Sequence, residues 1–263
     1  MKKIVHAFPT LIDLLNTSHC ETLLNACWGL AFLTEDNESV VQSLIEQNLT
    51  PKLTSFLQHE NPKIALVALR VLGNFILCGH LQHLIDSAFM NHVQSLLNNP
   101  HSSVRSETCY LLSLVTDHGT DYIDLLISIP TAMRRVIEIM QDSPLHERTE
   151  AIWVIFNIAN KGSDLQLKTL VELGVIPSLC QNLQVHDVKI VLLILESIEN
   201  ILLVGERMAL QYKISFEECG GRQKLESLLD HRSDDVYRKT NQICDEYFCE
   251  ECRDEYEDEI WYD

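Results

Sequence analysis

The segment Glu150-Ala-Ile-Trp-Val-Ile-Phe-Asn157 decides the fold, because comparable apolar segments return along the chain at nearly equal intervals. Trp153 lies midway along this segment, and the corresponding positions of successive segments are separated by 42, 40, 43 and 43 residues. We call these positions the reference row; its members are Trp28, Arg70, Tyr110, Trp153 and Glu196. Each lies in a helix-like apolar run that ends at a turn or a polar stretch, and alternating strand patterns are missing. The sequence therefore predicts one helical unit repeated along the chain.

A repeat of this length is typical of stacked helical units of the armadillo or HEAT kind. We predict an all-α, armadillo-repeat solenoid wound as a right-handed superhelix, with three helices in each unit. The third helix is expected to be the longest and nearly apolar all round, as in residues 64–77, because neighbouring units cover it on both sides. A stack of this kind has a long inner surface and no buried catalytic pocket by default. Function is therefore sought on the inner surface.

The expected array covers residues 1–249 and is followed by an acidic tail. The tail, 250–263, holds eight acidic residues and one arginine, and it is predicted to be disordered. The first unit lacks one helix and a polar cap, which indicates a fragment, a truncated product or a partner that covers this end. The expected boundaries are a partial first repeat at 1–36, repeats at about 37–79, 80–118, 119–162 and 163–205, and a variant last repeat at 206–249.

Proline and asparagine mark several expected helix starts. Proline is tolerated at the first helical position because its missing N–H has no intrahelical partner there. Asn61-Pro62 and Asn99-Pro100 are interpreted as capped starts of two third helices. The prolines that precede the expected second helices are Pro9, Pro51, Pro130 and Pro177.

Charge limits the classes of partner. The formal net charge is −18, of which −7 lies in residues 250–263 and −11 in the rest of the chain. An acidic protein is not concentrated on phosphate backbones or anionic lipid, so we expect no nucleic acid and no membrane as partner, and basic partners instead.

The location is predicted from cysteine usage and from hydropathy. Nine cysteines without a disulfide-framework spacing are interpreted as free thiols in a reducing compartment. The first residues lack the apolar core of a signal peptide, and no uncharged apolar stretch reaches about 18 residues. The expected location is the cytoplasm and the nucleus.

No spacing of residues predicts catalysis. The sequence has no Gly-rich phosphate loop, no HExxH and no nucleophile elbow. Cys249 and Cys252 form a lone CxxC, which by itself does not complete a tetrahedral zinc site. His80, His83 and His92 form a loose group that is interpreted as surface residues. We therefore expect no catalytic residue, no metal, no cofactor and no enzyme.

Two further columns share a helix face with the reference row, because residues three and four apart in a helix are neighbours. Four residues after the row come Phe32, Asn74, Leu114, Asn157 and Asn200. Three residues before it come Asn25, Val67, Glu107, Glu150 and Leu193. One face of the third helices thus carries aromatic rings, amides and carboxylates in register.

Several segments resemble, in order, the armadillo repeats of importin alpha, the adaptors that carry nuclear-localisation signals. The resemblance covers about residues 4–249 and corresponds to the family's fifth to tenth repeats. The segments that carry it are Cys27-Trp-Gly-Leu-Ala-Phe-Leu-Thr34, Leu69-Arg-Val-Leu-Gly-Asn74, Glu150-Ala-Ile-Trp-Val-Ile-Phe-Asn157, Val171-Glu-Leu-Gly-Val-Ile-Pro177, Glu199-Asn-Ile-Leu202, Glu217-Glu-Cys-Gly-Gly221 and Asp245-Glu-Tyr-Phe248.

The resemblance implies that the third helices line a concave groove, which holds a basic signal peptide in extended conformation. Tryptophans then stack on Lys or Arg stems, asparagines bond the peptide backbone and acids meet the charged heads. A cation over Trp contributes on the order of 0.5–2 kcal/mol, so several columns must act together. The peptide-binding residues implied in this way are Trp153, Asn157, Glu150, Glu107, Arg70, Asn74, Tyr110, Trp28 and Asn200.

The chain departs from the family pattern at two of these positions and at its start. Tyr110 stands where the family has Trp, and Leu114 stands where it has Asn, so a weakened minor peptide site is expected. The basic segment with which the family recruits importin beta has no counterpart in this sequence, which argues against importin beta as a partner. The last repeat matches the region that helps the family to bind its export receptor, which makes that receptor a possible partner.

Two interpretations stay open. The leading one is a nuclear-import adaptor that binds basic nuclear-localisation-signal peptides or cargo proteins. The alternative is a truncated or diverged armadillo scaffold that binds transport receptors or other proteins without carrying cargo; Tyr110 and Leu114 favour it. The individual residues also have plainer explanations, since tryptophans at helical spacing also pack in cores, asparagines also cap helices, and acids also form solvated faces.

Overall fold

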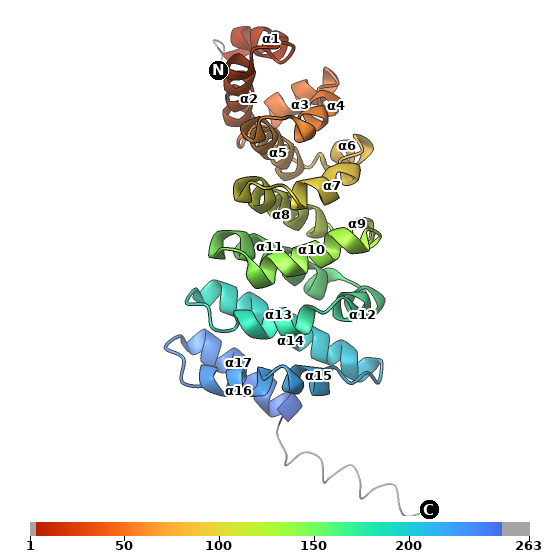
Figure 1. Cartoon of the computed structure of the whole chain (residues 1–263), viewed down its shortest axis with the longest axis vertical. Helices are drawn as coiled ribbons and strands as arrows, with labels where there is room; N and C mark the ends of the chain where they lie inside the picture. Colours follow the sequence, from red (N-terminus) through yellow and green to blue (C-terminus); the bar gives the residue numbers. More distant parts are fainter. Residues whose placement is uncertain (1–3, 249–263) are drawn as a thin grey trace, which may run out of the picture. The chain divides into compact units, whose positions relative to one another are not determined.

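The computed structural model describes the backbone of residues 4–248 and the side chains of residues 9–248. The described part is helical and contains no β-strand (Figure 1). It divides into two compact units, residues 4–157 and 158–248, and the border lies inside helix α11 (Leu145–Lys161). The expected acidic tail, 250–263, lies outside the described residues. Among the helices that the structure describes, none is long and apolar enough to cross a membrane.

The helices of the first unit follow one another as two short helices and one longer helix, after an opening pair. The longer ones are α2, α5, α8 and α11, and we call them the third helices. The first unit contains α1 (Ile4–Leu14), α2 (Cys20–Thr34), α3 (Glu38–Glu46), α4 (Thr50–Ser55) with a 3-10 turn η1 (Phe56–Gln58), α5 (Pro62–Leu77), α6 (Leu81–Asp86), α7 (Met90–Leu97), α8 (Ser102–Thr116), α9 (Thr120–Ile127), α10 (Pro130–Asp142) and the first part of α11.

The second unit continues from α11 with the same order of helices. Its third helices are α14 and α17, and α14 packs against α12, α13, α15 and α17. The second unit contains α12 (Asp164–Glu172), α13 (Val175–Asn182), α14 (Val188–Arg207), α15 (Tyr212–Glu218), α16 (Gly221–Leu228) and α17 (Asp234–Phe248).

Helix α5 shows why the third helices form the core of the first unit. It packs against α2 on one side and α8 on the other, so an apolar sequence all round is buried. Val67 and Leu69 lie on nearly opposite faces of this helix, and both are fully buried. The prediction of a long apolar helix here is confirmed, since α5 begins at Pro62 and ends at Leu77.

The predicted helix starts are confirmed at Asn61 and wrong at Asn99. The side chain of Asn61 accepts a hydrogen bond from the N–H of Lys63 and caps α5. Helix α8 begins at Ser102 instead, because the Asn99 side chain caps the turn before it by accepting from the N–H of His101.

The prolines differ in position within their helices. Pro130 is the first residue of α10 and Pro51 the second of α4, whereas Pro177 is the third residue of α13 and Pro9 lies inside α1. Two glycines make tight turns between short helices of the second unit. Gly174 lies between α12 and α13, and Gly220 lies between α15 and α16. Their φ angles of 92° and 71° are in the left-handed region, which glycine adopts without strain.

Candidate functional site

A pocket of about 390 Å³ lies in the first unit, where the third helices carry the reference row. It brings together six of the site residues expected from the sequence, which are Trp28, Arg70, Asn74, Glu107, Tyr110 and Glu150. The other lining residues are Ala31, Phe32, Glu35 and Ser106. The pocket thus combines three aromatic rings with three carboxylates and a single arginine.

An aromatic ledge forms one side of the pocket. Trp28 and Phe32 are four residues apart on α2, so their rings stack, with centroids 5.8 Å apart and an angle of 28° between the planes. Phe32 is 68% exposed, which is unusual for a large apolar ring. The ledge therefore offers a flat apolar surface that a ligand can cover.

Arg70 lies on this ledge. Its guanidinium carbon is 5.2 Å from the centre of the Trp28 ring, which is the geometry of a cation–π contact. Its Nε atom also donates to Oε2 of Glu107 at 3.1 Å, from α5 to α8. An aromatic face and a carboxylate in this unit thus hold a guanidinium between them.

Two carboxylates of the pocket are strained electrostatically. Burial raises the pKa of Glu107, although the charge of Arg70 and its hydrogen bond act in the opposite direction. Burial also raises the pKa of Glu150, and the negative charge of Glu107 raises it further. Burial and the same two carboxylates raise the pKa of Tyr110. A second cation in this pocket would relieve the repulsion between Glu107 and Glu150.

The asparagines of the groove face are bonded to the preceding third helix. Asn74 donates from Nδ2 to the carbonyl of Ala31 at 3.1 Å and to Oγ1 of Thr34 at 2.8 Å. Asn157 is 5% exposed, and its Nδ2 donates to the carbonyl of Ser113 at 2.8 Å. Both amide nitrogens are therefore used inside the protein, and Asn157 lies between helices rather than on an open surface.

The two residues that depart from the family pattern lie beside Gly73 of α5. A Cβ atom on Gly73 would come within 3.8 Å of Tyr110 and within 3.9 Å of Leu114. Both side chains are half-buried, so they fill the space above the α5 backbone. Leu114 makes an apolar contact where Asn74 and Asn157 make hydrogen bonds.

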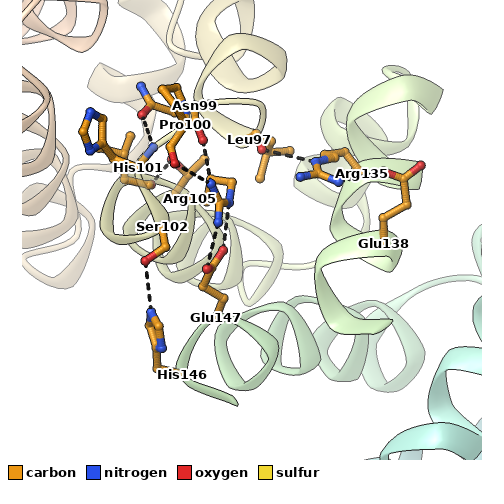
Figure 2. Close-up of polar contacts among 12 residues, drawn as sticks. Leu97, Asn99, Pro100, His101, Ser102, Arg105, Arg135, Glu138, His146 and Glu147 are labelled. Atoms are coloured by element: carbon orange, nitrogen blue, oxygen red, sulfur yellow. Dashed lines mark hydrogen bonds and ion pairs between the residues drawn. The ribbon is translucent and has the colours of Figure 1, made fainter. Parts of the chain in front are cut away.

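A buried ion pair sets the spacing of the two strained carboxylates. Arg105 of α8 binds Glu147 of α11 through two bonds, Nε to Oε2 at 2.8 Å and Nη2 to Oε1 at 2.9 Å (Figure 2). The Glu147 side chain is 0% exposed, and Nη1 of Arg105 also donates to the carbonyls of Asn99 and Pro100. The pair fixes α8 against the start of α11, where Glu107 and Glu150 lie within one turn of it.

The remaining expected residues lie outside this pocket. Trp153 is half-buried on α11, and its ring meets the ring of Phe156 edge-on at a centroid distance of 5.7 Å. In the second unit Asn200 is half-buried on α14. Next to it, Glu199 binds Lys239 and accepts from Nε2 of Gln242 at 3.0 Å, both from α17. A basic side chain and an acid thus pair between third helices in this unit as well.

Three residues of the site were not predicted from the sequence. Ala31 lies on α2 and Glu35 follows its end, both outside the expected columns, and Ser106 directly precedes Glu107. The pair of Arg105 and Glu147 carried a usable signal, since opposite charges separated by 42 residues lie one repeat apart. Among residues 9–248, no group of three His, Cys, Asp or Glu side chains is arranged to hold a metal ion.

Comparisons with known proteins agree with the helical-repeat fold. Residues 211–261 match a family model described as an atypical Arm repeat. The chain is 31% identical over 261 residues to importin subunit alpha-4 of Arabidopsis thaliana, which covers 95% of this chain and 48% of that protein. It is 29% identical over 260 residues to importin subunit alpha-1b of Oryza sativa subsp. japonica, with coverage of 95% and 48%. Over almost its whole length, this chain is therefore homologous to importin alpha subunits.

The importin alpha resemblance seen in the sequence is therefore confirmed, and the match is consistent with the family's C-terminal armadillo region. The chain spans about half the length of the curated relatives it matches. Solved structures support the fold. A designed armadillo repeat protein in complex with the peptide (KR)4 has a TM-score of 0.78 at 20% identity, covering 90% of this chain and 98% of its own.

A second solved neighbour is a computationally designed armadillo repeat protein for modular peptide recognition, with a TM-score of 0.80 at 20% identity. It also covers 90% of this chain and 98% of its own. The predicted all-α armadillo solenoid is thus confirmed for this importin alpha relative.

Proposed function

We propose that this chain forms part of a nuclear-import adaptor and that it binds a basic nuclear-localisation-signal peptide along its third helices. The observation that carries the proposal is the pocket of the first unit, where Trp28, Glu107 and Glu150 offer an aromatic face and two carboxylates. Similarity to importin alpha subunits supports the same function, and we propose the cytoplasm and the nucleus as the location. The proposed activity is binding without catalysis.

The chemistry of the pocket suits a Lys or Arg side chain. The apolar stem of such a side chain can cover the exposed ring of Phe32, while its charged head meets Glu150 and Glu107. Among the described residues, Glu150 makes no ion pair, and the carboxylate of Glu107 raises its pKa. A basic ligand would supply the missing counter-charge, so binding should be coupled to ionisation of these carboxylates.

The proposed peptide contacts of the first unit also include Trp153 and Asn157, and Asn200 is proposed as a contact of the second unit by itself. Trp153 would stack on a second basic stem, as the aromatic member of its pair with Asn157. The Asn157 amide can serve a peptide only through Oδ1, or through Nδ2 after that atom leaves the carbonyl of Ser113. We therefore assign the larger contribution to the aromatic rings and carboxylates and the smaller one to the amides.

The test uses a fluorescent octapeptide of alternating Lys and Arg and measures its binding by anisotropy. We expect saturable binding that Glu107→Gln weakens about threefold to tenfold, because a half-buried charged contact is worth on the order of 1 kcal/mol. Trp153→Ala should weaken binding by a similar factor, since it removes a cation–π face.

Glu138→Gln is the matched control for the charge change. Glu138 lies on α10 and pairs with Arg135 outside the pocket, at 2.9 Å. This variant should change the affinity less than twofold, since Glu138 does not line the pocket and its exposed charge is screened by solvent and salt. Equal binding of an alternating Asp-Glu peptide, or equal effects of Glu107→Gln and Glu138→Gln, would contradict the proposed site.

A second function is favoured by two specific observations. Leu114 replaces an amide by an apolar contact, and the buried Asn157 already uses its amide nitrogen. An armadillo scaffold that binds transport receptors or other proteins without carrying cargo would need neither amide. Recovery of karyopherins but of no basic cargo in a pull-down would favour this alternative.

A further inference from the structure

We infer that Arg70 is an internal competitor for basic ligands, because its guanidinium occupies the cation subsite formed by Trp28 and Glu107. A ligand side chain enters this subsite only when Arg70 moves out of it. The inference rests on the proposed function, since it concerns selection of ligands in the same pocket. It makes Arg70 the residue that sets how strongly the first unit holds a basic peptide.

The contacts of Arg70 are those that a bound arginine would make. Its guanidinium carbon lies 5.2 Å from the Trp28 ring centre, and its Nε donates to Glu107 at 3.1 Å. Aromatic face and carboxylate are the two groups that recognise a planar cation. A second guanidinium cannot use the same face of Trp28 while Arg70 covers it.

The reference row shows that Arg70 is an exception. Trp28, Tyr110 and Trp153 supply aromatic rings at the equivalent positions of the other third helices in this unit. Arg70 supplies instead the kind of group that aromatic positions attract. Arg70 therefore covers the aromatic ring of Trp28, and it supplies no aromatic ring at its own position in the row.

Burial indicates that the contact can open. The Arg70 side chain is 46% exposed, whereas the side chain of Glu107 beneath it is 15% exposed. Among the described residues, the hydrogen bond to Glu107 is the one bond of the Arg70 guanidinium. Exposed ion pairs and exposed cation–π contacts are weak, so a peptide with several basic residues can displace this side chain.

The net charge of the pocket supports the same conclusion. Glu35, Glu107 and Glu150 line it, and Arg70 is the one basic residue among the lining side chains. Displacement of Arg70 leaves all three carboxylates available to a ligand. The pocket is thus partly neutralised in the free protein and strongly acidic once Arg70 has moved.

The experiment compares Arg70→Gln with a control that removes the same charge elsewhere. Arg238→Gln is that control, because Arg238 lies on α17, is 71% exposed and pairs with Asp235 in the second unit. The probe is the alternating Lys-Arg octapeptide, titrated at low salt and at about 0.5 M salt, where long-range attraction is screened.

We expect Arg70→Gln to bind the octapeptide about threefold to tenfold more tightly than the natural chain, at both salt concentrations. Arg238→Gln should give less than a twofold gain, which disappears at high salt. The indole N–H resonance of Trp28, assigned with Trp28→Phe, should shift in free Arg70→Gln, where the ring is uncovered, and should also shift when peptide replaces Arg70 in the natural chain.

The outcomes separate this inference from the proposed function. If the natural chain binds and Arg70→Gln matches the control or binds more weakly, Arg70 is not a competitor and the proposed function stands. If neither protein binds the octapeptide, the proposed function fails and the inference fails with it. If Arg70→Gln is unstable by circular dichroism, Arg70→Lys replaces it, since an ammonium loses the planar stacking; unchanged binding of Arg70→Lys then overturns the inference.

Discussion

The side-chain amide of Asn157 donates a 2.8 Å hydrogen bond to the main-chain carbonyl of Ser113, across two successive third helices. Asn74 makes the corresponding bond to the carbonyl of Ala31. Each donor follows its reference-row residue by four positions, and each acceptor follows the preceding row residue by three. The sequence separations are 44 and 43 residues, close to one repeat. The amide column therefore joins one repeat to the next, whatever it contributes to a peptide.

Replacement of Asn157 by alanine should destabilise the first unit. The change removes a buried hydrogen bond, which costs about 0.5–1.5 kcal/mol, while the carbonyl of Ser113 still accepts from the N–H of Asp117 at 3.0 Å. Urea denaturation followed by circular dichroism measures the effect. The control is Asn160→Ala in the same helix, because Asn160 is exposed. Equal stability of the two variants would show that the bond to Ser113 contributes nothing.

The fold could be predicted from the sequence because it depends on periodicity. The reference row, the apolar run of α5 and the cap at Asn61 are properties of spacing and of residue type, and all are readable without coordinates. The predicted start of α8 is too early, because asparagine followed by proline is typical of a helix N-cap. In the structure, the capped backbone N–H belongs to His101 in the preceding turn.

The pocket could be predicted only in part. Positions three and four residues apart share a face, which was enough to bring together Trp28, Arg70 and Glu107. Spacing does not give the direction of a side chain, however. It could not show that Arg70 covers Trp28, nor that the amide of Asn157 turns inward to Ser113. Both depend on rotamers that the neighbouring repeat selects.

Replacement of Arg105 by methionine should destabilise the protein more than loss of the Asn157 amide. Glu147 is completely buried and holds both bonds of the pair (Figure 2). Removal of its partner leaves a buried, uncompensated charge, which typically costs about 3–5 kcal/mol. Thermal and urea denaturation measure the loss.

Arg135→Met is the control for the Arg105 variant. Arg135 is partly exposed and pairs with the exposed Glu138 at 2.9 Å, so its removal should cost at most about 1 kcal/mol. A double variant, Arg105→Met with Glu147→Leu, should recover much of the loss, because it removes the unpaired charge as well. No recovery would mean that packing of the arginine stem, and not charge, is the main contribution.

Replacement of Phe32 by alanine should affect binding without affecting the fold. Phe32 is 68% exposed, so its removal should change stability by less than about 0.5 kcal/mol. The affinity for the Lys-Arg octapeptide should fall severalfold, because a ligand stem loses the outer ring of the ledge. Leu165→Ala is the control, since Leu165 is 66% exposed in the second unit. An equal change of affinity in both variants would show that the ledge takes no part.

Replacement of Glu150 by glutamine should lower the affinity for the peptide and raise the stability of the folded protein at neutral pH. Burial and the charge of Glu107 raise the pKa of Glu150 above its ordinary value of 4.5, so its ionised form is disfavoured in the folded protein. A raised folded-state pKa gives stability that is fully present below the ordinary value and is lost as the pH rises through the folded value. Removal of this negative charge at neutral pH should therefore raise the melting temperature.

The pH dependence distinguishes this cause from a general effect of the substitution. The advantage of Glu150→Gln should shrink as the pH falls from 7 toward 4.5, because Glu150 becomes protonated in the natural chain. Over the same range, the natural chain should lose affinity for the octapeptide as Glu107 and Glu150 lose their charge. Glu138→Gln should lose affinity over this range as the natural chain does, since it keeps both Glu107 and Glu150 and changes a residue outside the pocket. A constant difference in melting temperature across this range would show that Glu150 is not electrostatically strained.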